Sequence, residues 1–358
     1  MKTKWGVLGS GGIARRRTIP EGIAAAANAE LVAVYDVSGE ANRAVAAQFG
    51  ARACDTEKAL LETDCDIVYV ATPAYLHCDQ VVRAAEAGKH VLCEKPLGMT
   101  IEEGRRMMQA CRRNRVKLGT GFMMRFHAQH REALRLIREG RLGTPTLGRA
   151  QLSCWYPPIE GAWRQDPGLG GGGSLMDMGG HCIDLLEMFL GRARRVCCFA
   201  ENLVHGYESE DTAAVLLEFE SGAKGVVDAL FNVPDASSKN RLELCGSRGS
   251  ILAEGTIGQG EAGVMTAYLE DAGRLLEVAA GYDAAQARDP EDAGRLPAAG
   301  RAIEPVPVNM YRAEVDAFAR AVLEDSDPPV SGEDGLWSQT VLTACYESAA
   351  LGRAVDLS

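Results

Sequence analysis

The sequence predicts an α/β fold divided between two domains. A chain of 358 residues exceeds the size at which a single hydrophobic core usually stops growing. Short apolar strands alternate with helices as far as Gly121, which predicts a parallel sheet with right-handed crossovers. Strand patterns dominate again between residues 196 and 254 and predict an open sheet. We therefore expect one domain over residues 1–123 and a second over residues 124–358.

Composition and charge narrow the class of protein. The chain is 46% hydrophobic and 24% charged, as ordinary globular proteins are. Its net charge of −11 argues against nucleic-acid and anionic-membrane partners. No signal-peptide pattern and no membrane-length apolar run is present. The eleven cysteines contain no C-x-x-C pair, which indicates reduced thiols without a metal site. We expect a cytoplasmic protein.

A glycine-rich motif follows the first strand, which is expected over residues 5–8. It is the G-x-G-x-x-A variant of the dinucleotide fingerprint, formed by Gly9, Gly11, Gly12, Ile13 and Ala14. Gly9 allows the tight turn, and Gly11 lets the backbone approach a pyrophosphate. A helix expected to reach about Ala27 would present its N-terminus to the phosphates.

Asp36 ends the second strand, Leu31–Tyr35, near the spacing expected of an acid that binds the adenosine ribose. Its charge would repel a 2′-phosphate, so NAD is favoured over NADP. The alternative for Asp36 is a simple turn residue at a strand end. The adjacent arginines 15–17 are expected on a solvated helix face, from which one could reach a phosphate.

Further candidates follow the ends of later strands, expected over residues 66–71, 90–93 and 117–121, with helices over 40–49, 56–62, 78–88 and 100–114. Ligands on a parallel sheet lie at the carboxyl ends of its strands. We therefore expect five residues to face a cofactor: Thr72, Pro73, His77, Glu94 and Lys95. The Lys95 ammonium could also stabilise developing charge on a substrate oxygen. Its alternative is a solvated lysine paired with Glu94.

A second glycine run opens a helical segment over residues 170–184. Asp177 lies four residues before His181 and Asp184 three residues after it, so the three share one helix face. A neighbouring carboxylate would raise the basicity of the imidazole and fix its tautomer, as a general base requires. The alternative is a capped amphipathic helix with one polar histidine.

These segments resemble the Gfo/Idh/MocA family of NAD(P)-dependent oxidoreductases. The resemblance is carried by ATPAYLH at 71–77, EKPLGMT at 94–100 and GGGSLMDMGGHCIDLLE at 171–187, and it extends almost end to end. It implies a Rossmann domain followed by an α/β domain on a large, mostly antiparallel open sheet, with the active site between them. It also implies a homodimer or homotetramer that associates through that sheet.

The resemblance further implies a catalytic set of Lys95, Asp177 and His181. His181 would take the hydroxyl proton, Asp177 would orient the substrate, and Lys95 would stabilise the reacting oxygen. Asp184 is expected to be structural, and Arg125 is assigned to the cofactor site. His127 and His130 follow that arginine and are expected to be solvated helix histidines and not a metal pair.

Three residues of a loop after the strand at 146–154 suit a polyhydroxylated ring. Tyr156 and Trp163 offer aromatic faces, and Arg164 offers forked donors. Their alternative is loop packing. Together with loops 232–240 and 281–304, this loop is expected to shape the pocket, and residues 281–304 are expected at the surface. Helices are expected over residues 128–139, 310–323 and 335–351.

The sequence favours the hypothesis that the protein is an NAD(H)-dependent dehydrogenase that acts on a secondary alcohol of a sugar, glycoside or cyclitol. Two alternatives remain open. Some members of the family are glycosidases that retain NAD and use transient ring oxidation. A third reading is a non-catalytic sugar sensor, against which the complete Lys95–Asp177–His181 set argues.

Overall fold

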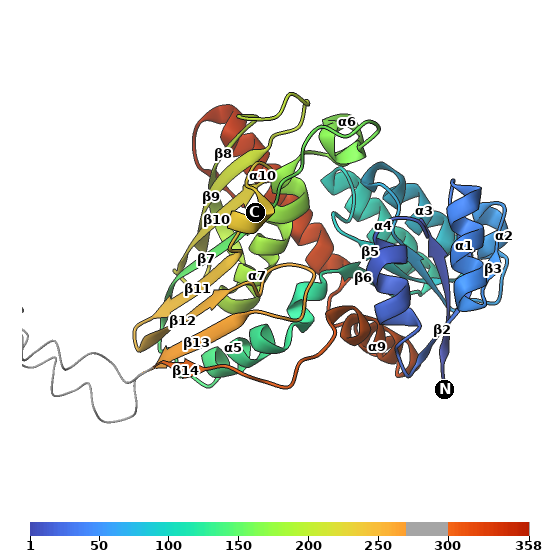
Figure 1. Ribbon diagram of the computed structural model, residues 1–358, viewed down its shortest axis with the longest axis horizontal. Coiled ribbons are helices and arrows are strands. Elements are labelled where there is room, and N and C mark those ends of the chain that lie inside the picture. Colours follow the sequence, from blue (N-terminus) through green and yellow to red (C-terminus); the bar gives the residue numbers. More distant parts are fainter. Residues whose placement is uncertain (270–299, 358) are drawn as a thin grey trace, which may run out of the picture.

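Two β-sheets organise the protein (Figure 1). The computed structural model describes residues 1–269 and 300–357. Six strands form the first sheet in the order β3-β2-β1-β4-β5-β6, and nine form the second in the order β14-β13-β12-β11-β7-β10-β9-β8-β15. The expected α/β fold, with a parallel first sheet and a mostly antiparallel second sheet, is confirmed.

All strand pairs of the first sheet are parallel. Its strands are β1 Thr3–Leu8, β2 Ala29–Tyr35, β3 Arg52–Ala53, β4 Ile67–Val70, β5 His90–Glu94 and β6 Leu118–Gly121. Its helical segments are η1 Ala14–Ile23, α1 Gly39–Phe49, α2 Glu57–Leu61, α3 Ala74–Glu86 and α4 Ile101–Asn114. Strand order reverses between β1 and β4, which opens a crevice at the carboxyl edge where dinucleotides bind.

Local signals explain most of the helix boundaries. The side chains of Ser38, Thr56 and Thr100 cap α1, α2 and α4. The expected start of α3 at residue 78 was wrong, because the helix begins directly after Pro73, the residue at its N-cap position. The last helix also begins earlier than expected, since Ser331 forms a capping box.

The second sheet is antiparallel except for the β7–β10 pair. Its strands are β7 Pro145–Ser153, β8 Ala193–Glu201, β9 Thr212–Phe219, β10 Lys224–Leu230, β11 Arg241–Gly246, β12 Gly249–Glu254, β13 Val264–Leu269, β14 Arg301–Ala302 and β15 Val355–Asp356. Helices α5 Ala128–Arg138, α7 Gly180–Leu190 and α10 Gly332–Leu351 lie on the side facing the first sheet (Figure 1). The largest core cluster lies between these helices and the sheet.

Helix α9, Met310–Leu323, returns to the first sheet although it follows strands β7 to β14 of the second sheet in sequence. Its Phe318 packs edge-on against Trp5, with ring centroids 6.2 Å apart. Residues 281–299 of the expected surface loop lie outside the described residues. Within the described ranges, no helix is both long and apolar enough to cross a membrane.

Candidate active site

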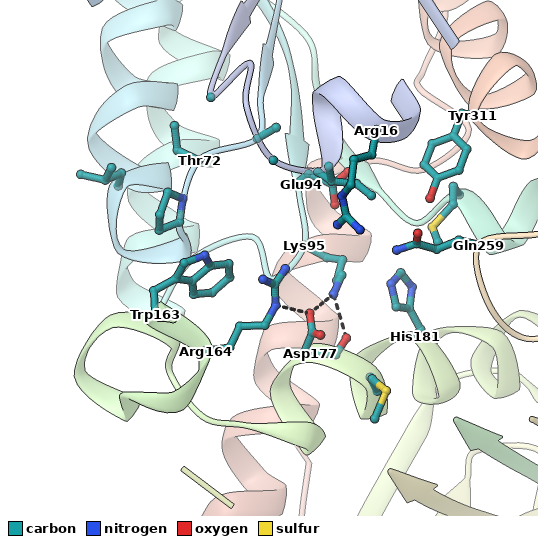
Figure 2. Close-up of a pocket in the computed structure, with 18 of the residues that line it drawn as sticks. Arg16, Thr72, Glu94, Lys95, Trp163, Arg164, Asp177, His181, Gln259 and Tyr311 are labelled. Carbon is teal, nitrogen blue, oxygen red and sulfur yellow. Dashed lines mark hydrogen bonds and ion pairs between the residues drawn. The ribbon is translucent and has the colours of Figure 1, made fainter. Parts of the chain in front are cut away.

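A cavity of about 1080 Å³ extends from the first glycine motif to the helix that carries Asp177 and His181 (Figure 2). It brings together most of the residues expected at a site: Gly9, Gly12, Ile13, Asp36, Thr72, Pro73, Glu94, Lys95, Trp163, Arg164, Asp177 and His181. Four others are not among its lining residues: Gly11, His77, Arg125 and Tyr156.

The glycine motif forms one end of the cavity. Gly9 has a φ of 85°, and a Cβ there would lie 2.7 Å from the backbone of Ala71. A Cβ on Gly12 would meet no described atom within 4 Å, so this turn is open to a ligand. The Gly11 amide donates to Asp36 Oδ2 at 2.7 Å, which fixes the carboxylate at the end of β2.

A second carboxylate near this end, that of Glu57, was not predicted from the sequence. Glu57 lines the cavity and binds Arg83, with Nε and Oε1 2.6 Å apart. Glu57 and Arg83 neutralise each other, so this pair adds no net charge, and the carboxylate of Asp36 lies near the expected ribose position. The open glycine turn and Asp36 fit NAD(H). Arginines 15–17 were expected on a solvated helix face from which one could reach a phosphate, and Arg16 lines the cavity (Figure 2).

His77 lies outside the cavity, between the turns that follow β4 and β5. Its two ring nitrogens lie 2.9 Å from the Pro96 carbonyl and 2.8 Å from the Thr72 carbonyl. The ring is buried, and burial lowers the pKa of His77 below its ordinary value. Because a neutral imidazole carries one N–H, His77 donates one of these two hydrogen bonds, and its ring lies between two strand-end turns and is not part of the cavity lining.

The other end of the cavity is built around Asp177 (Figure 2). Lys95 Nζ donates to Asp177 Oδ1 at 2.6 Å and to the Asp177 carbonyl at 2.8 Å. Arg164 Nε lies 3.1 Å from the same Oδ1. Burial alone would raise the pKa of Asp177, but the charges of Arg164 and Lys95 outweigh it and hold that pKa well below its ordinary value. Asp177 is therefore ionised and fixes the position of Lys95.

His181 faces the cavity without a carboxylate partner (Figure 2). Its Nδ1 is buried and makes no hydrogen bond within the described residues. Burial and the nearby Lys95 ammonium hold the pKa of His181 well below 6.5, and the Asp177 charge offsets this only in part. Asp177 does raise the basicity of His181, as expected, but burial and Lys95 outweigh it, and no hydrogen bond from Asp177 to Nδ1 fixes the tautomer. The imidazole is neutral near pH 7 and can accept a proton.

Asp184 does not bracket His181 either. Both of its oxygens accept from Arg125, at distances of 2.6 to 2.9 Å. The expected structural role of Asp184 agrees with this geometry. It also explains why Arg125, expected at the cofactor, is not among the residues that line the cavity, since its side chain is committed to this pair. Its cofactor role remains a prediction that the geometry does not favour.

The three residues expected to bind a sugar from the loop after β7 do not all line the cavity. The Arg164 guanidinium carbon lies 4.2 Å from the ring centroid of Trp163, so the two restrain each other at the cavity wall. Tyr156 instead packs against Phe231, with ring centroids 4.8 Å apart, and does not line the cavity.

Several lining residues were missed. Asp235, Ser238 and Asn240 come from the loop at 232–240, which was expected to shape the pocket although none of its residues was predicted individually. Gln259 comes from the glycine-rich connection between β12 and β13, and Tyr311 lies in the first turn of α9. The four glycines of residues 255–263 were the only available signal for that connection.

The expectation of solvated histidines after Arg125 was also wrong. His127 and His130 are buried, with ring centroids 4.7 Å apart. His130 lies within hydrogen-bond distance of Met124 O and Thr256 Oγ1, and burial lowers its pKa to about 3. Among the described residues, no group of three or more His, Cys, Asp or Glu is placed to hold a metal ion.

Comparison with protein families decides the identity of this scaffold. Residues 3–122 match the oxidoreductase family with an NAD-binding Rossmann fold, and residues 130–252 match the GFO/IDH/MocA C-terminal domain. The chain belongs to the Gfo/Idh/MocA family. It is therefore an NAD(P)-dependent oxidoreductase with an NAD-binding Rossmann domain.

Characterised relatives of this Gfo/Idh/MocA member span its whole length. It is 31% identical to 1,5-anhydro-D-fructose reductase of Ensifer adhaerens, over 99% of this chain and 98% of that protein. It is also 31% identical to D-xylose 1-dehydrogenase (NADP(+)) 2 of Haloferax volcanii, over 99% of each. The aldose-aldose oxidoreductase of Caulobacter crescentus, solved with glycerol, superimposes with a TM-score of 0.84 at 29% identity over 100% of both chains.

Proposed function

We propose that this enzyme oxidises a secondary hydroxyl of an uncharged sugar, glycoside or cyclitol with NAD, and reduces the corresponding ketone with NADH. One observation carries the proposal: Lys95, Asp177 and His181 meet at one end of a cavity whose other end is the dinucleotide motif. The relatives named above act on anhydrofructose and xylose, which are neutral sugars.

Each of the three residues has a distinct task. The neutral imidazole of His181 takes the proton of the substrate hydroxyl, or returns it in the reverse direction. The Lys95 ammonium stabilises the negative charge that develops on that oxygen. Asp177 holds Lys95 in place. Bound NAD would supply a hydride acceptor for the adjacent carbon, and bound NADH a hydride donor.

The charge balance at this end supports an uncharged substrate. Lys95 and Arg164 are two cations, but both contact the ionised Asp177. Asp235 adds a second carboxylate to the wall. An anionic sugar would therefore gain little from the cations, whereas hydroxyl groups can hydrogen-bond to every one of these side chains.

Asp36 supports NAD as the preferred cofactor, because a 2′-phosphate would approach its carboxylate, whereas the Glu57–Arg83 ion pair carries no net charge. The test is the ratio of kcat/KM with NAD to kcat/KM with NADP on one substrate. A clear preference for NADP would contradict this assignment.

The proposed reaction is tested with a panel of aldoses, anhydrosugars, inositols and aryl glycosides in the presence of NAD. We expect net NADH formation with at least one member, and none with the Lys95→Met variant. Release of the aryl group without net NADH would instead favour the NAD-retaining glycosidase. A sugar that raises Tm without any turnover would favour the sensor.

We also propose that two copies associate through the outer face of the second sheet. Phe199 on β8 and Leu216 on β9 are 69% and 57% exposed, and strand register places both on this face. Light scattering after gel filtration should give a dimer or tetramer for the wild type and a smaller species for Leu216→Glu. Val204→Glu, at an exposed loop position, is the matched control. A monomeric wild type would contradict the assignment.

The same proposal includes two domains, over residues 1–123 and 124–358, and a cytoplasmic location. All eleven cysteines are free, which supports a reducing compartment.

A further inference from the structure

The helix that carries Asp177 and His181 begins without a cap of its own. It starts at Leu175 as η4, Leu175–Gly179, and continues into α7. Ser174 precedes it, but the Ser174 hydroxyl makes no capping hydrogen bond and is buried without a partner among the described residues. The first amides of this helix must therefore find acceptors elsewhere.

Glu210, in the connection between β8 and β9, supplies these acceptors. Its carboxylate accepts from the Gly173 amide and from the Leu175 amide, each at 2.9 Å. Its backbone carbonyl accepts from the Ser174 amide at 3.0 Å. Tyr346 of α10 donates its hydroxyl to the same carboxylate at 2.9 Å. One residue thus holds three consecutive amides, and its charge also favours the positive end of the helix dipole.

The approach of the two segments is very close. A Cβ on Gly173 would lie 2.0 Å from the Glu210 carbonyl oxygen. A Cβ on Gly172, whose φ is 155°, would lie 1.9 Å from the Tyr346 hydroxyl. These two glycines therefore let the start of the helix reach Glu210, which gives the second glycine run a physical reason.

Hydrogen bonds connect Glu210 to the proposed catalytic groups. The Asp177 amide donates to the Gly173 carbonyl at 2.9 Å, and Lys95 Nζ donates to the Asp177 carbonyl at 2.8 Å. The adjacent Ser209 amide donates to the Gln165 carbonyl at 3.2 Å, next to Arg164. Glu210 itself does not line the cavity. It can influence the chemistry only through the segments that it holds.

The Glu210 segment is itself firmly anchored. The carboxylate of the next residue, Asp211, accepts from three consecutive amides, those of Leu203, Val204 and His205, at 2.8 to 2.9 Å. A fixed acceptor of this kind can set the position of a helix, whereas a mobile one would follow it.

We propose that Glu210 is a positioning residue for the reaction. It fixes the axial position and rotation of the helix, so that Asp177 meets Lys95 and His181 faces the substrate. This inference rests on the proposed function for its kinetic test, but its structural test needs no substrate.

Two substitutions separate length from charge. Glu210→Gln keeps the length and one acceptor oxygen, while Glu210→Asp keeps the charge but withdraws the carboxylate by one methylene. We expect kcat on an active substrate to fall roughly tenfold to a hundredfold in Glu210→Asp, as small misplacements of catalytic groups do. Glu210→Gln should stay within about threefold of wild type, since its oxygen still accepts. The KM for NAD should not change in either variant.

Glu208→Asp is the matched control, because this carboxylate is exposed two residues away. A Glu210→Asp enzyme with wild-type kcat would overturn the proposal, as would a Gln variant less active than the Asp variant. Loss of NAD binding in parallel with kcat would overturn it too, because a general structural role would then suffice.

A crystal structure of the Glu210→Asp variant tests the role of Glu210 without any substrate. We expect the 2.8 Å hydrogen bond between Lys95 Nζ and the Asp177 carbonyl to be lost. Its retention with an unmoved helix would overturn the inference. If the wild type oxidises no sugar at all, the proposed function fails while this structural test still decides the role of Glu210.

Discussion

The two ends of the active-site cavity are built in different ways. The cofactor end consists largely of backbone and of residues that follow neighbouring strands of one parallel sheet, with Gly9 and Asp36 at its centre. The substrate end is made of side chains from separate segments: Lys95 after β5, Arg164 in η3 Trp163–Gln165, Asp177 in η4 and His181 in α7. The first end depends on one local motif, whereas the second depends on how distant segments meet.

The two ends of the cavity also differ in net charge. At the cofactor end, Asp36 contacts backbone amides, and its carboxylate lines the cavity. At the substrate end, Asp177 lies between two cations, and with Asp235 it leaves a nearly neutral wall. Substitutions at the substrate end should therefore alter kcat, and those at the cofactor end should alter cofactor KM.

The largest effect is expected from Lys95→Met. This change removes the ammonium that is proposed to stabilise the reacting oxygen and that donates to Asp177. We expect kcat to fall by about 10³-fold, or about 4 kcal/mol of barrier, with the Kd for NAD unchanged. Steady-state kinetics and a fluorescence titration with NAD measure the two quantities. Lys58→Met, an 85% exposed lysine, is the control, and near wild-type turnover of Lys95→Met would remove Lys95 from the mechanism.

A smaller loss is expected from His181→Asn. The amide cannot take the hydroxyl proton, so kcat should fall on the order of 10²-fold while both ligands still bind. The same kinetic and titration measurements apply. Unchanged kcat would show that another group accepts the proton.

At the cofactor end, Asp36→Asn should act on binding alone. Loss of the charge weakens hydrogen bonds to the ribose by about 1.5 kcal/mol, which corresponds to a rise of roughly tenfold in the KM for NAD. We expect kcat on saturation with NAD to stay at the wild-type value. A fall in kcat at constant KM would contradict the separation of the two ends.

The smallest effect is expected from acidification between pH 7 and pH 6. A histidine accepts protons only while it is neutral. Because the pKa of His181 is lowered, its imidazole stays neutral even when the pH falls below 6.5, the ordinary pKa of histidine. The kcat/KM for oxidation should therefore stay level over this range and fall only as pH drops through the lowered pKa. An acid limb centred at pH 6.5 or above would show that burial does not control this group.

The same contrast explains what could be predicted from the sequence. The fold class, the glycine motif and Asp36 depend on local spacing, and the structure places the motif and Asp36 at one end of the cavity. Lys95, Asp177 and His181 were expected together and do lie together. Their catalytic roles remain predictions.

The partners of these residues could not be predicted. Helix spacing placed Asp177 and Asp184 beside His181, but each carboxylate instead pairs with cations from other segments. Asp177 contacts both Lys95 and Arg164, and Asp184 contacts Arg125. Helical spacing shows which residues share a face, and tertiary packing decides which charges meet. For the same reason, His130 was expected in solvent and is buried.

The most direct test of the central claim follows the hydride itself. A sugar that the wild type oxidises is prepared with deuterium on the carbon that becomes the carbonyl, and the reduced cofactor is analysed by mass spectrometry. If the two ends of the cavity form one hydride-transfer site, the deuterium will appear in NADH, and the His181→Asn enzyme will form that product far more slowly. Deuterium released to water, with none in the cofactor, would contradict the account.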